Sequence, residues 1–411
     1  MVESPRGLTV CFFNRSYWPD FGATGQLLTE LAEDLVAHHG CEVTVVTGYP
    51  VRQTAPTPAR EVRNGVQIVR AAGTTLDPRR FVGRATNYMT YFASACVAGL
   101  RLPPSDVVVS LTDPPIIGLA ALLKARRSGG RFVFLSQDIF PEVAALLEDF
   151  HNEAVNGALN RINRYLLRQA DAVIALGTTM KRRLVEGKGA DPAKVSVIDN
   201  WADCSALAPA PKDSPFARAH GLHDRFVVMH AGNIGLSQNL DIVLDAAERL
   251  RACDGIRFVM MGDGSRRAAL ERAARERRLD NIVFLPYQPR QEMTNAYAAA
   301  DVFLVSLKPG LAGYIVPSKV YSILAAGRPY VAAVEEHCEV ADLTRAYGCG
   351  FVVAPGDADA LSARILELQA DRQLAGHMGV SARAAGLLFD RPRQVAAYAA
   401  LFHRVAGSPA A

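Results

Sequence analysis

The stretch FVVMHAGNIGLSQNLDIVL, residues 226–244, contains the pattern that decides the fold. It begins with a mostly apolar run of strand length, residues 226–231. A polar, glycine-rich turn follows, and Gln238 and Asn239 then open a segment whose apolar residues recur at helical spacing. A buried strand, a glycine turn and an amphipathic helix in succession are the repeating unit of parallel α/β sheets.

The same unit recurs along most of the chain, because short apolar runs alternate with amphipathic segments. In the first half, strands are predicted at residues 8–13, 42–47, 106–111, 131–136, 172–176 and 195–198. In the second half, they are predicted at residues 226–231, 256–261, 282–285, 302–305, 330–333 and 351–353. One helix is predicted at residues 25–39, with Gly40 as its C-cap, and another at residues 391–405.

A proline-rich segment, APAPKDSP at residues 208–215, interrupts this periodicity near the middle of the chain. The 411 residues suit two domains of about 200 residues each. We therefore predict an α/β protein with two Rossmann-like domains, residues 1–205 and 206–388. The last segment, residues 389–411, is predicted to carry a helix that packs back on the first domain.

The composition excludes several classes of protein. The formal net charge is only +4, and no basic stripe with interleaved aromatic residues indicates a nucleic-acid partner. The seven cysteines are scattered singly, which is typical of reduced thiols and not of disulfides or a zinc site. No signal sequence opens the chain and no apolar run is long enough to span a membrane, so we expect a soluble, cytoplasmic protein.

The loop after the first predicted strand is one candidate ligand site, because ligands of parallel sheets bind where strands end. Gly22 and Gly25 let a ligand approach the backbone there, and the start of the following helix favours a negative group. The spacing is not that of a dinucleotide-binding fingerprint. A long loop with helix-entry glycines and no ligand is the alternative interpretation.

Asp138 follows another predicted strand and is a second candidate. At this position its carboxylate is placed to hold a sugar hydroxyl or an acceptor molecule. The alternative is that Asp138 caps the helix that Pro141 begins. Both interpretations stay open from the residues alone.

Pro317-Ser318-Lys319 precedes a short helix that Gly327 and Pro329 bring to an end. Ser318 is predicted to be the N-cap of this helix. Lys319, in the first turn, opposes the helix dipole and is slightly unfavourable unless an anion compensates for it. A diphosphate at this point would account for Ser318 and Lys319 together. A solvated surface lysine is the alternative.

Residues 79–100 form an apolar and aromatic segment, with Tyr88 and Tyr91, behind a basic cluster that includes Arg79 and Arg80. We expect a helix that packs in the core. The alternative is a helix on a membrane surface, where it would meet a lipid-linked acceptor.

Several weak motifs follow one another in a characteristic order. They are Tyr17-Trp18-Pro19 with Gly22 and Gly25; Gln137-Asp138 with Pro141-Glu142; residues 199–203; Gly232-Asn233-Ile234-Gly235 with Gln238-Asn239-Leu240; Gly262-Asp263-Gly264; Pro317-Ser318-Lys319; residues 325–329; and Pro355-Gly356-Asp357. This ordered set spans about 340 residues. It resembles the bacterial-type retaining GT-B glycosyltransferases of the fourth family, in the branch that adds sugars to surface polysaccharides such as O-antigen and colanic acid.

The resemblance implies two Rossmann-like domains facing each other across a cleft, the first for the acceptor and the second for the donor. The implied donor is a nucleotide-diphosphate sugar, in particular a UDP-sugar. A hexose or N-acetylhexosamine would pass, with retention, to a saccharide or lipid-linked saccharide at the inner face of the membrane. No metal or other cofactor is implied, because backbone amides and basic side chains neutralise the leaving diphosphate.

The resemblance also implies roles for individual residues. It assigns donor contacts to Gly22, Gly25, Gly232, Asn233, Gln238, Gly262, Ser318 and Lys319, and it places Tyr287 and Gln288 where the nucleotide base rests. It assigns Gln137 and Asp138 to the reaction centre, and Glu339 to the donor sugar or its phosphate side.

The chain departs from the wider family at three places. Asn233 and Gln238 replace the usual arginine and lysine after the first strand of the second domain. Tyr314 and Ser322 stand where the family has paired glutamates, and Gln137 stands where many members have a histidine. The polysaccharide branch shares the first substitutions, and they shift the expected phosphate contact towards Lys319.

Other functions remain as alternatives to transfer between saccharides. The acceptor could be a small natural product instead. A nucleotide-sugar epimerase on the same scaffold would need acid and base carboxylates, and the missing glutamate pair argues against it. A non-catalytic nucleotide-sugar-binding subunit is a third alternative, which the lost charged positions keep open.

Overall fold

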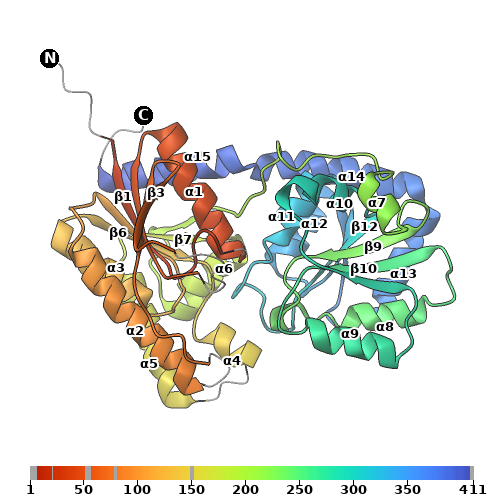
Figure 1. Cartoon of the computed structure of the whole chain (residues 1–411), viewed down its shortest axis with the longest axis horizontal. Coiled ribbons are helices and arrows are strands. Elements are labelled where there is room, and N and C mark those ends of the chain that lie inside the picture. The colour runs from red at the N-terminus through yellow and green to blue at the C-terminus, as the bar shows by residue number, and fades with distance from the viewer. Residues whose placement is uncertain (1–6, 21, 51–56, 78–80, 149–151, 408–411) are drawn as a thin grey trace. The chain divides into compact units, whose positions relative to one another are not determined.

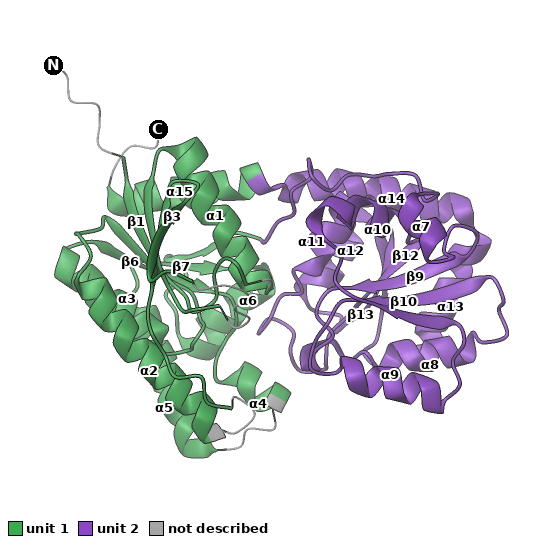
Figure 2. Ribbon diagram, viewed as in Figure 1, with its two compact units in different colours: residues 1–199, 392–411 green, residues 200–391 purple. Residues whose placement is uncertain are grey.

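The computed structural model describes residues 7–20, 22–50, 57–77, 81–148 and 152–407 (Figure 1). The chain forms two compact units, Met1–Asp199 with Pro392–Ala411 and Asn200–Arg391 (Figure 2). Each unit is a predominantly parallel sheet covered by helices on both faces, so the predicted α/β class and the two Rossmann-like units are confirmed.

The first unit contains a sheet of eight strands. They are β1 Thr9–Phe13, β2 Glu42–Thr47, β3 Arg60–Arg63, β4 Val66–Arg70, β5 Val107–Ser110, β6 Arg131–Ser136, β7 Ala172–Ala175 and β8 Val195–Val197. Their order is β3-β4-β2-β1-β5-β6-β7-β8, and every pair is parallel except β3 with β4. The chain reverses direction between β1 and β5, which is where ligands bind in sheets of this type.

The helices of the first unit connect these strands. They are α1 Ala23–His39, α2 Phe81–Leu100, α3 Ile117–Ser128, α4 Glu142–Glu148, α5 Glu153–Gln169, α6 Thr178–Arg182 and, from the end of the chain, α15 Arg391–Ala406. Gly40 ends α1 in a left-handed conformation, as predicted. The ring of Phe402 on α15 packs 6.1 Å from that of Phe12 on β1, so the last helix adds to the core of this unit.

The second unit contains a sheet of six strands that are all parallel. They are β9 Phe226–Ala231, β10 Ile256–Met261, β11 Ile282–Leu285, β12 Val302–Ser306, β13 Tyr330–Ala333 and β14 Gly350–Val353. Their order is β11-β10-β9-β12-β13-β14, and the change of direction lies between β9 and β12. All six residues of β9 are buried, because helices cover both faces of this central strand.

The helices of the second unit include α7 Pro215–Ala219, α8 Asp241–Arg249, α9 Arg267–Glu276, α10 Met293–Ala298, α11 Lys319–Ala325, α12 Glu339–Tyr347, α13 Ala358–Ala370 and α14 Arg372–Gly386. Apolar residues of α8 and α13 pack with β9 and β10 in one core cluster, which includes Val228, Leu244, Phe258 and Ile365. This core holds the strand ends, and the loops that leave them, in fixed positions.

The predicted strands all occur, and each bound lies within one residue of the prediction. The hairpin of β3 and β4 was not predicted. Its turn is formed by Asn64 and Gly65, both with positive φ, which is a strong hairpin signal in a sequence. Among the described residues, no helix combines the length and the apolar character needed to cross a membrane.

Residues 81–100 of the predicted segment form α2, and Arg79 and Arg80 of its predicted basic cluster lie outside the described residues. Tyr91 and Ala95 of this helix are buried, as expected for a helix that packs in the core. Its Val82 and Met89 are exposed to 72% and 55%. One face of α2 is therefore part of the core, and another face is apolar and unburied.

Candidate functional site

The carboxyl ends of β9 and β10 carry two glycine turns that pack backbone against backbone. Gly232 and Gly262 follow these strands with φ of 121° and 145°. A Cβ atom on Gly262 would lie 1.9 Å from the Gly232 carbonyl oxygen, so only glycine fits there. The Gly232 amide donates to the Met261 carbonyl at 2.9 Å, which fixes the two turns together. The result is a polar backbone surface at the edge of the sheet.

Lys319 is the first residue of α11, the helix that follows β12. Its side chain reaches the glycine turns of β9 and β10 across the point between β9 and β12 where the strand order changes direction. Its Nζ lies 3.3 Å from Nε2 of His230. A Cβ atom on Gly232 would lie 3.7 Å from the lysine Cε, so the glycine leaves room for this side chain. Lys319 is only partly exposed, in contrast to the solvated lysine of the alternative interpretation.

The electrostatics of Lys319 are unusual for a lysine. Burial lowers its pKa from an ordinary value of 10.5 to about 7. In the described part of the chain Lys319 forms no ion pair with a carboxylate, and no charged group offsets the effect of burial. An anion bound beside Nζ would supply the missing countercharge and favour the ammonium form.

Ser318 does not act as the predicted N-cap. Its side chain makes no capping hydrogen bond, and its φ and ψ of −60° and −21° are already helical. An N-cap residue needs an extended backbone to turn its side chain onto the first amides, so the prediction was wrong. Ser318 remains next to Lys319 in the candidate site.

The turn after β9 is shaped by its own polar side chains. The Gln238 Oε1 accepts a hydrogen bond from the Gly235 amide at 3.0 Å, which folds a short 3-10 turn over Leu236–Gln238. Asn233 lies against Gly235, where an added Cβ would come within 2.6 Å of its Nδ2. The two residues that replace the family's usual arginine and lysine therefore hold the turn in shape.

Three other predicted residues lie at the same edge of this sheet. Tyr287 and Gln288 follow β11, and Tyr287 is 50% exposed. Burial of the rest of this side chain raises the pKa of Tyr287. Glu339 begins α12, after β13, which is two strands away from β9 in the sheet. The structure thus joins the predicted glycines to Lys319 directly, and places Tyr287 and Glu339 on opposite sides of them.

The first unit has its own polar cluster where β1, β5 and β6 end. Arg15 follows β1, and its Nε lies 3.2 Å from Oδ1 of Asp113, which follows β5. The Arg15 guanidinium also lies 5.3 Å from the ring centre of Tyr88 on α2. Asp138 follows β6, and its amide donates to Thr112 at 3.4 Å. The strand order therefore gathers two carboxylates, an arginine and an aromatic ring at one place.

Asp138 has a perturbed titration in this cluster. Burial, with the nearby Asp113 charge, raises its pKa from an ordinary value of 3.8 to about 7. Its carboxylate makes no hydrogen bond to α4 among the described residues, so the alternative in which Asp138 caps this helix is wrong. Gln137 is its partly exposed neighbour. A carboxyl group that changes charge near neutral pH can accept a hydroxyl proton.

A buried lysine anchors the loop that follows Asp138. The Nζ of Lys188 donates to the Phe140 carbonyl at 3.2 Å and to the Asn160 Oδ1 at 2.8 Å. It also pairs with the Glu142 carboxylate at 2.6 Å. These contacts fix the loop between β6 and α4, and Lys188 is a structural residue that sequence analysis did not single out.

The glycines of the first loop have different surroundings. Gly22 precedes α1 and is exposed, with open space where a Cβ would stand. Gly25 is buried, and an added Cβ would lie 3.4 Å from the Tyr17 amide nitrogen. Gly22 is therefore accessible to a ligand, whereas Gly25 serves close packing within the loop.

Sequence analysis missed several residues of these clusters. Arg15 stands two positions after the end of β1 and Asp113 three positions after the end of β5, which was the available signal. His230 lies inside β9 and was counted with the strand. Glu335, after β13, accepts hydrogen bonds from the amides of Gly310 and Ala312 at 3.2 Å each, and so shapes the loop before α11.

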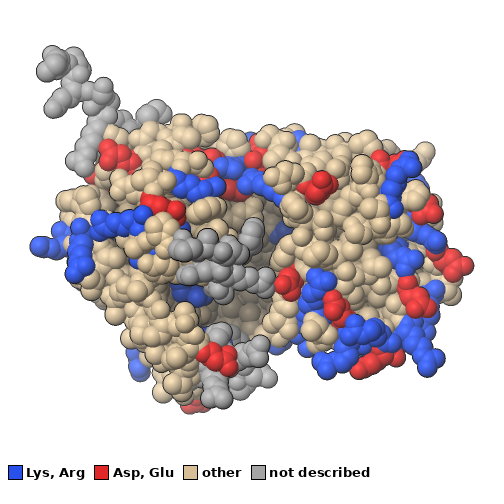
Figure 3. Space-filling view, viewed as in Figure 1, with Lys and Arg blue, Asp and Glu red and all other residues tan. Residues whose placement is uncertain are grey.

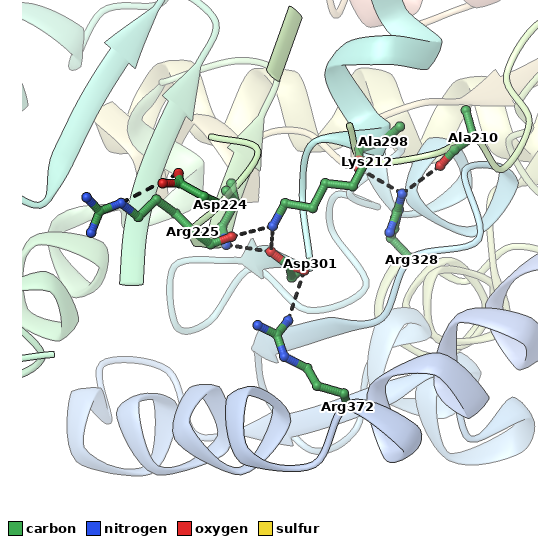
Figure 4. Close-up of polar contacts among 9 residues, drawn as sticks. Ala210, Lys212, Asp224, Arg225, Ala298, Asp301, Arg328 and Arg372 are labelled. Carbon is green, nitrogen blue, oxygen red and sulfur yellow. Dashed lines mark hydrogen bonds and ion pairs between the residues drawn. The ribbon is translucent and has the colours of Figure 1, made fainter. Parts of the chain in front are cut away.

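A groove of about 620 Å³, which was not predicted, lies at the amino ends of β12 and β13 in the second sheet. Asp301, which lines this groove, pairs with Lys212 and with Arg372, as Figure 4 shows. Arg328 donates to the carbonyl oxygens of Ala210 and Ala298. These charged groups bond to other parts of the same unit. They connect the amino ends of the strands to the proline-rich segment that contains Ala210 and Lys212.

In the part of the chain that the structure describes, no three His, Cys, Asp or Glu side chains come together as a possible metal site.

Comparison with known proteins gives consistent matches in both halves of the chain. Residues 22–201 match the family described as "Glycosyl transferase 4-like domain", and residues 225–371 match "Glycosyl transferases group 1". The chain is 30% identical over 377 residues to the putative colanic acid biosynthesis glycosyl transferase WcaI of Escherichia coli K12, covering 87% of this chain and 91% of WcaI.

One further relative and one solved structure extend this result. The chain is 28% identical over 270 residues to the probable glycosyltransferase WbjE of Pseudomonas aeruginosa, covering 65% of this chain and 67% of WbjE. The crystal structure of Anabaena HepE in complex with UDP has a TM-score of 0.73 at 17% identity, covering 97% of this chain and all of the other. At that identity the likeness shows the fold alone, and it confirms the predicted GT-B type of two Rossmann-like units.

Proposed function

The chain belongs to the glycosyltransferases of the 4-like and group 1 families, and we propose that it transfers a hexose or N-acetylhexosamine from a UDP-sugar to a growing surface saccharide. The observation that carries the donor part is Lys319, a partly buried lysine beside two glycine turns and without a carboxylate partner in the described chain. An ammonium group in such surroundings is favoured by a nearby negative charge, and the diphosphate of a nucleotide sugar supplies one.

The proposed donor position follows from the edge of the second sheet. The diphosphate would lie at the turns of Gly232 and Gly262, against Lys319. Tyr287 and Gln288 flank this position beyond β10, where the exposed Tyr287 ring offers a surface for a base. The relatives crystallised with UDP and UDP-glucose support uridine as the base.

The chemistry requires that charge on the leaving diphosphate be neutralised. Lys319 and the backbone amides of the glycine turns would do this without a bound metal. Asp138 and Gln137 of the first unit would bind the reacting sugars, with Asp138 as the group that takes the proton of the acceptor hydroxyl. We propose retention of configuration on the basis of family membership, with Glu339 holding the donor sugar.

The proposed acceptor is a lipid-linked saccharide, and α2 supports this choice. Its exposed apolar residues recur at helical spacing and form a stripe along the helix, namely Val82, Met89, Val97 and Leu100. Arg101 and Arg127 are exposed near the same end of the helix pair α2 and α3. The surface over α2 carries few charged groups in Figure 3. An apolar stripe with basic residues beside it suits peripheral contact with an anionic membrane.

A thermal-shift screen with uridine, guanosine, adenosine and thymidine diphosphates tests the donor site. A ligand at 100 times its Kd adds about 2.7 kcal/mol to stability, which corresponds to a shift of roughly 5–10 °C for a unit of this size. We expect such a shift with UDP, and a much smaller one for Lys319→Ala.

Lys212→Ala is the matched control, because Lys212 pairs with Asp301 at the amino end of β12, whereas the candidate donor site lies at the carboxyl ends of the strands. This variant should melt earlier than the wild type but keep the full UDP-induced shift. Absence of a shift with every diphosphate, in the wild type, would refute the donor site and favour a non-catalytic role.

A further inference from the structure

We propose that His230 is a positioning residue for the donor diphosphate, because its Nε2 accepts a hydrogen bond from Lys319 and holds the lysine at the glycine turn until a phosphate oxygen takes its place. The inference rests on the proposed function, since it assumes that Lys319 binds the diphosphate. It assigns a role to a buried histidine that family membership and the motifs leave without one.

The geometry around His230 sets up a competition for one ring nitrogen. Nε2 lies 3.3 Å from the Lys319 Nζ and 3.3 Å from the Asn233 carbonyl oxygen. A single nitrogen cannot accept from the lysine and donate to the carbonyl at the same time. The neutral ring therefore has two arrangements, one that holds Lys319 and one that holds the turn at Asn233.

Burial keeps the ring neutral and so makes both arrangements available. His230 is fully buried, and burial together with the Lys319 charge keeps its pKa well below the ordinary value of 6.5. The Asn233 and Leu304 backbone groups oppose this effect only in part. A neutral imidazole can accept a hydrogen bond from an ammonium group, whereas an imidazolium would repel it.

The groups that face the pair are few within the described part of the chain. Lys319 on α11 is the charged side chain that acts on His230, while β12 contributes the backbone of Leu304. Among the residues that the structure describes, no carboxylate acts on Lys319, and the Glu335 carboxylate accepts hydrogen bonds from the loop amides of Gly310 and Ala312. The histidine is thus the polar partner that keeps the lysine in the site before the anion arrives.

Binding of the diphosphate follows as a proton-linked step. With the free lysine near half ionisation at pH 7, an arriving phosphate favours the ammonium and draws a proton from solution. The ammonium then donates to the phosphate oxygen, and the imidazole is free to turn its Nε2–H to the Asn233 carbonyl by exchanging its ring proton with solvent. No bond other than N–H changes in this step.

Calorimetric titration of the full-length protein with UDP measures this linkage. Titrations at pH 7.5, in buffers with different heats of ionisation, should show a net uptake of protons with each UDP bound, and this uptake should be smaller at pH 6, where most of the free lysine is already protonated. Uptake close to zero at pH 7.5, with binding intact, would overturn the proton-linked step without touching the donor site.

Variants at position 230 test the positioning role itself. His230→Gln keeps an acceptor oxygen, and we expect its Kd to stay within about threefold of wild type. His230→Leu has a similar volume without an acceptor, and we expect UDP affinity to fall by up to about tenfold, because a lysine that is not held at the turn must lose its rotamer freedom when UDP binds. Melting curves of both variants without ligand identify any loss of folding. If His230→Leu is folded and binds UDP with the same Kd as the wild type, the positioning role is refuted.

The outcome for Lys319→Ala separates this inference from the proposed function. If Lys319→Ala loses UDP binding but both His230 variants bind as the wild type does, the donor site stands and the positioning role fails. If Lys319→Ala binds UDP as tightly as wild type, the proposed donor site fails, and the inference falls with it.

Discussion

Replacing Asp138 with asparagine should make the first unit more stable at alkaline pH, and the effect should disappear in acid. The folded state holds a proton on Asp138 up to a pKa of about 7, whereas the unfolded chain releases it near 3.8. The free energy of unfolding is therefore unaffected by Asp138 ionisation below about pH 4, and it decreases as the pH rises from about 4 to about 7. Asparagine resembles the protonated acid and carries no charge to desolvate.

The expected size follows from the difference between the two pKa values. At 1.36 kcal/mol for each pH unit, the whole difference corresponds to at most about 4 kcal/mol. Asp138 keeps some contact with solvent, which lessens the cost of its charge. We expect Asp138→Asn to raise the free energy of unfolding by about 2 kcal/mol at pH 8 and by less than about 0.5 kcal/mol at pH 4.5.

Tryptophan fluorescence can report on the first unit alone. The chain has two tryptophans, Trp18 in the first unit and Trp201 in the second. In a Trp201→Phe background, urea unfolding followed through Trp18 therefore monitors the unit that contains Asp138. Asp280→Asn, at an exposed aspartate of the second unit, is the control and should leave the Trp18 transition unchanged. Equal destabilisation by Asp138→Asn at pH 4.5 and pH 8 would refute the assignment of a buried, protonated carboxyl.

Two further predictions concern the glycine turn and α2. Gly262→Ala should destabilise the second unit by more than about 3 kcal/mol and abolish UDP binding, because its Cβ would stand 1.9 Å from a backbone oxygen. Gly356→Ala, where φ is 83° but the space is open, should cost only about 1 kcal/mol in denaturant titrations, and equal costs would contradict the account. Val82→Asp with Met89→Asp should reduce co-flotation with anionic vesicles at least fivefold, whereas Val380→Asp, at another exposed valine, should not. Full flotation of the double variant would exclude α2 as the membrane contact.

The sequence was sufficient for most of the fold. Strands that are buried on both faces, such as β9 and β10, are near-continuous apolar runs, and these were predicted with their bounds. The hairpin was missed because β3 has the polar sequence of an edge strand, Arg60–Arg63. The turn of Asn64 and Gly65 was the signal that could have revealed it.

The candidate site was only partly predictable, because its decisive contacts join distant parts of the chain. Arg15 and Asp113 are 98 residues apart, and His230 and Lys319 are 89 apart. Strand order brings these pairs together, and periodicity along the sequence does not reveal strand order. Lys319 was found because a lysine at the start of a helix is locally unfavourable, a signal that needs no distant partner.

Transfer of sugar from a UDP-sugar in the presence of a lipid-linked saccharide tests the central claim most directly. UDP release and the mass of the saccharide product would be measured for the wild type and for Lys319→Ala. The account predicts UDP release that depends on the acceptor, a product heavier by one sugar, and a rate at least tenfold lower for Lys319→Ala. Interconversion of the donor without acceptor would indicate an epimerase, and an unchanged rate in Lys319→Ala would contradict the proposed site.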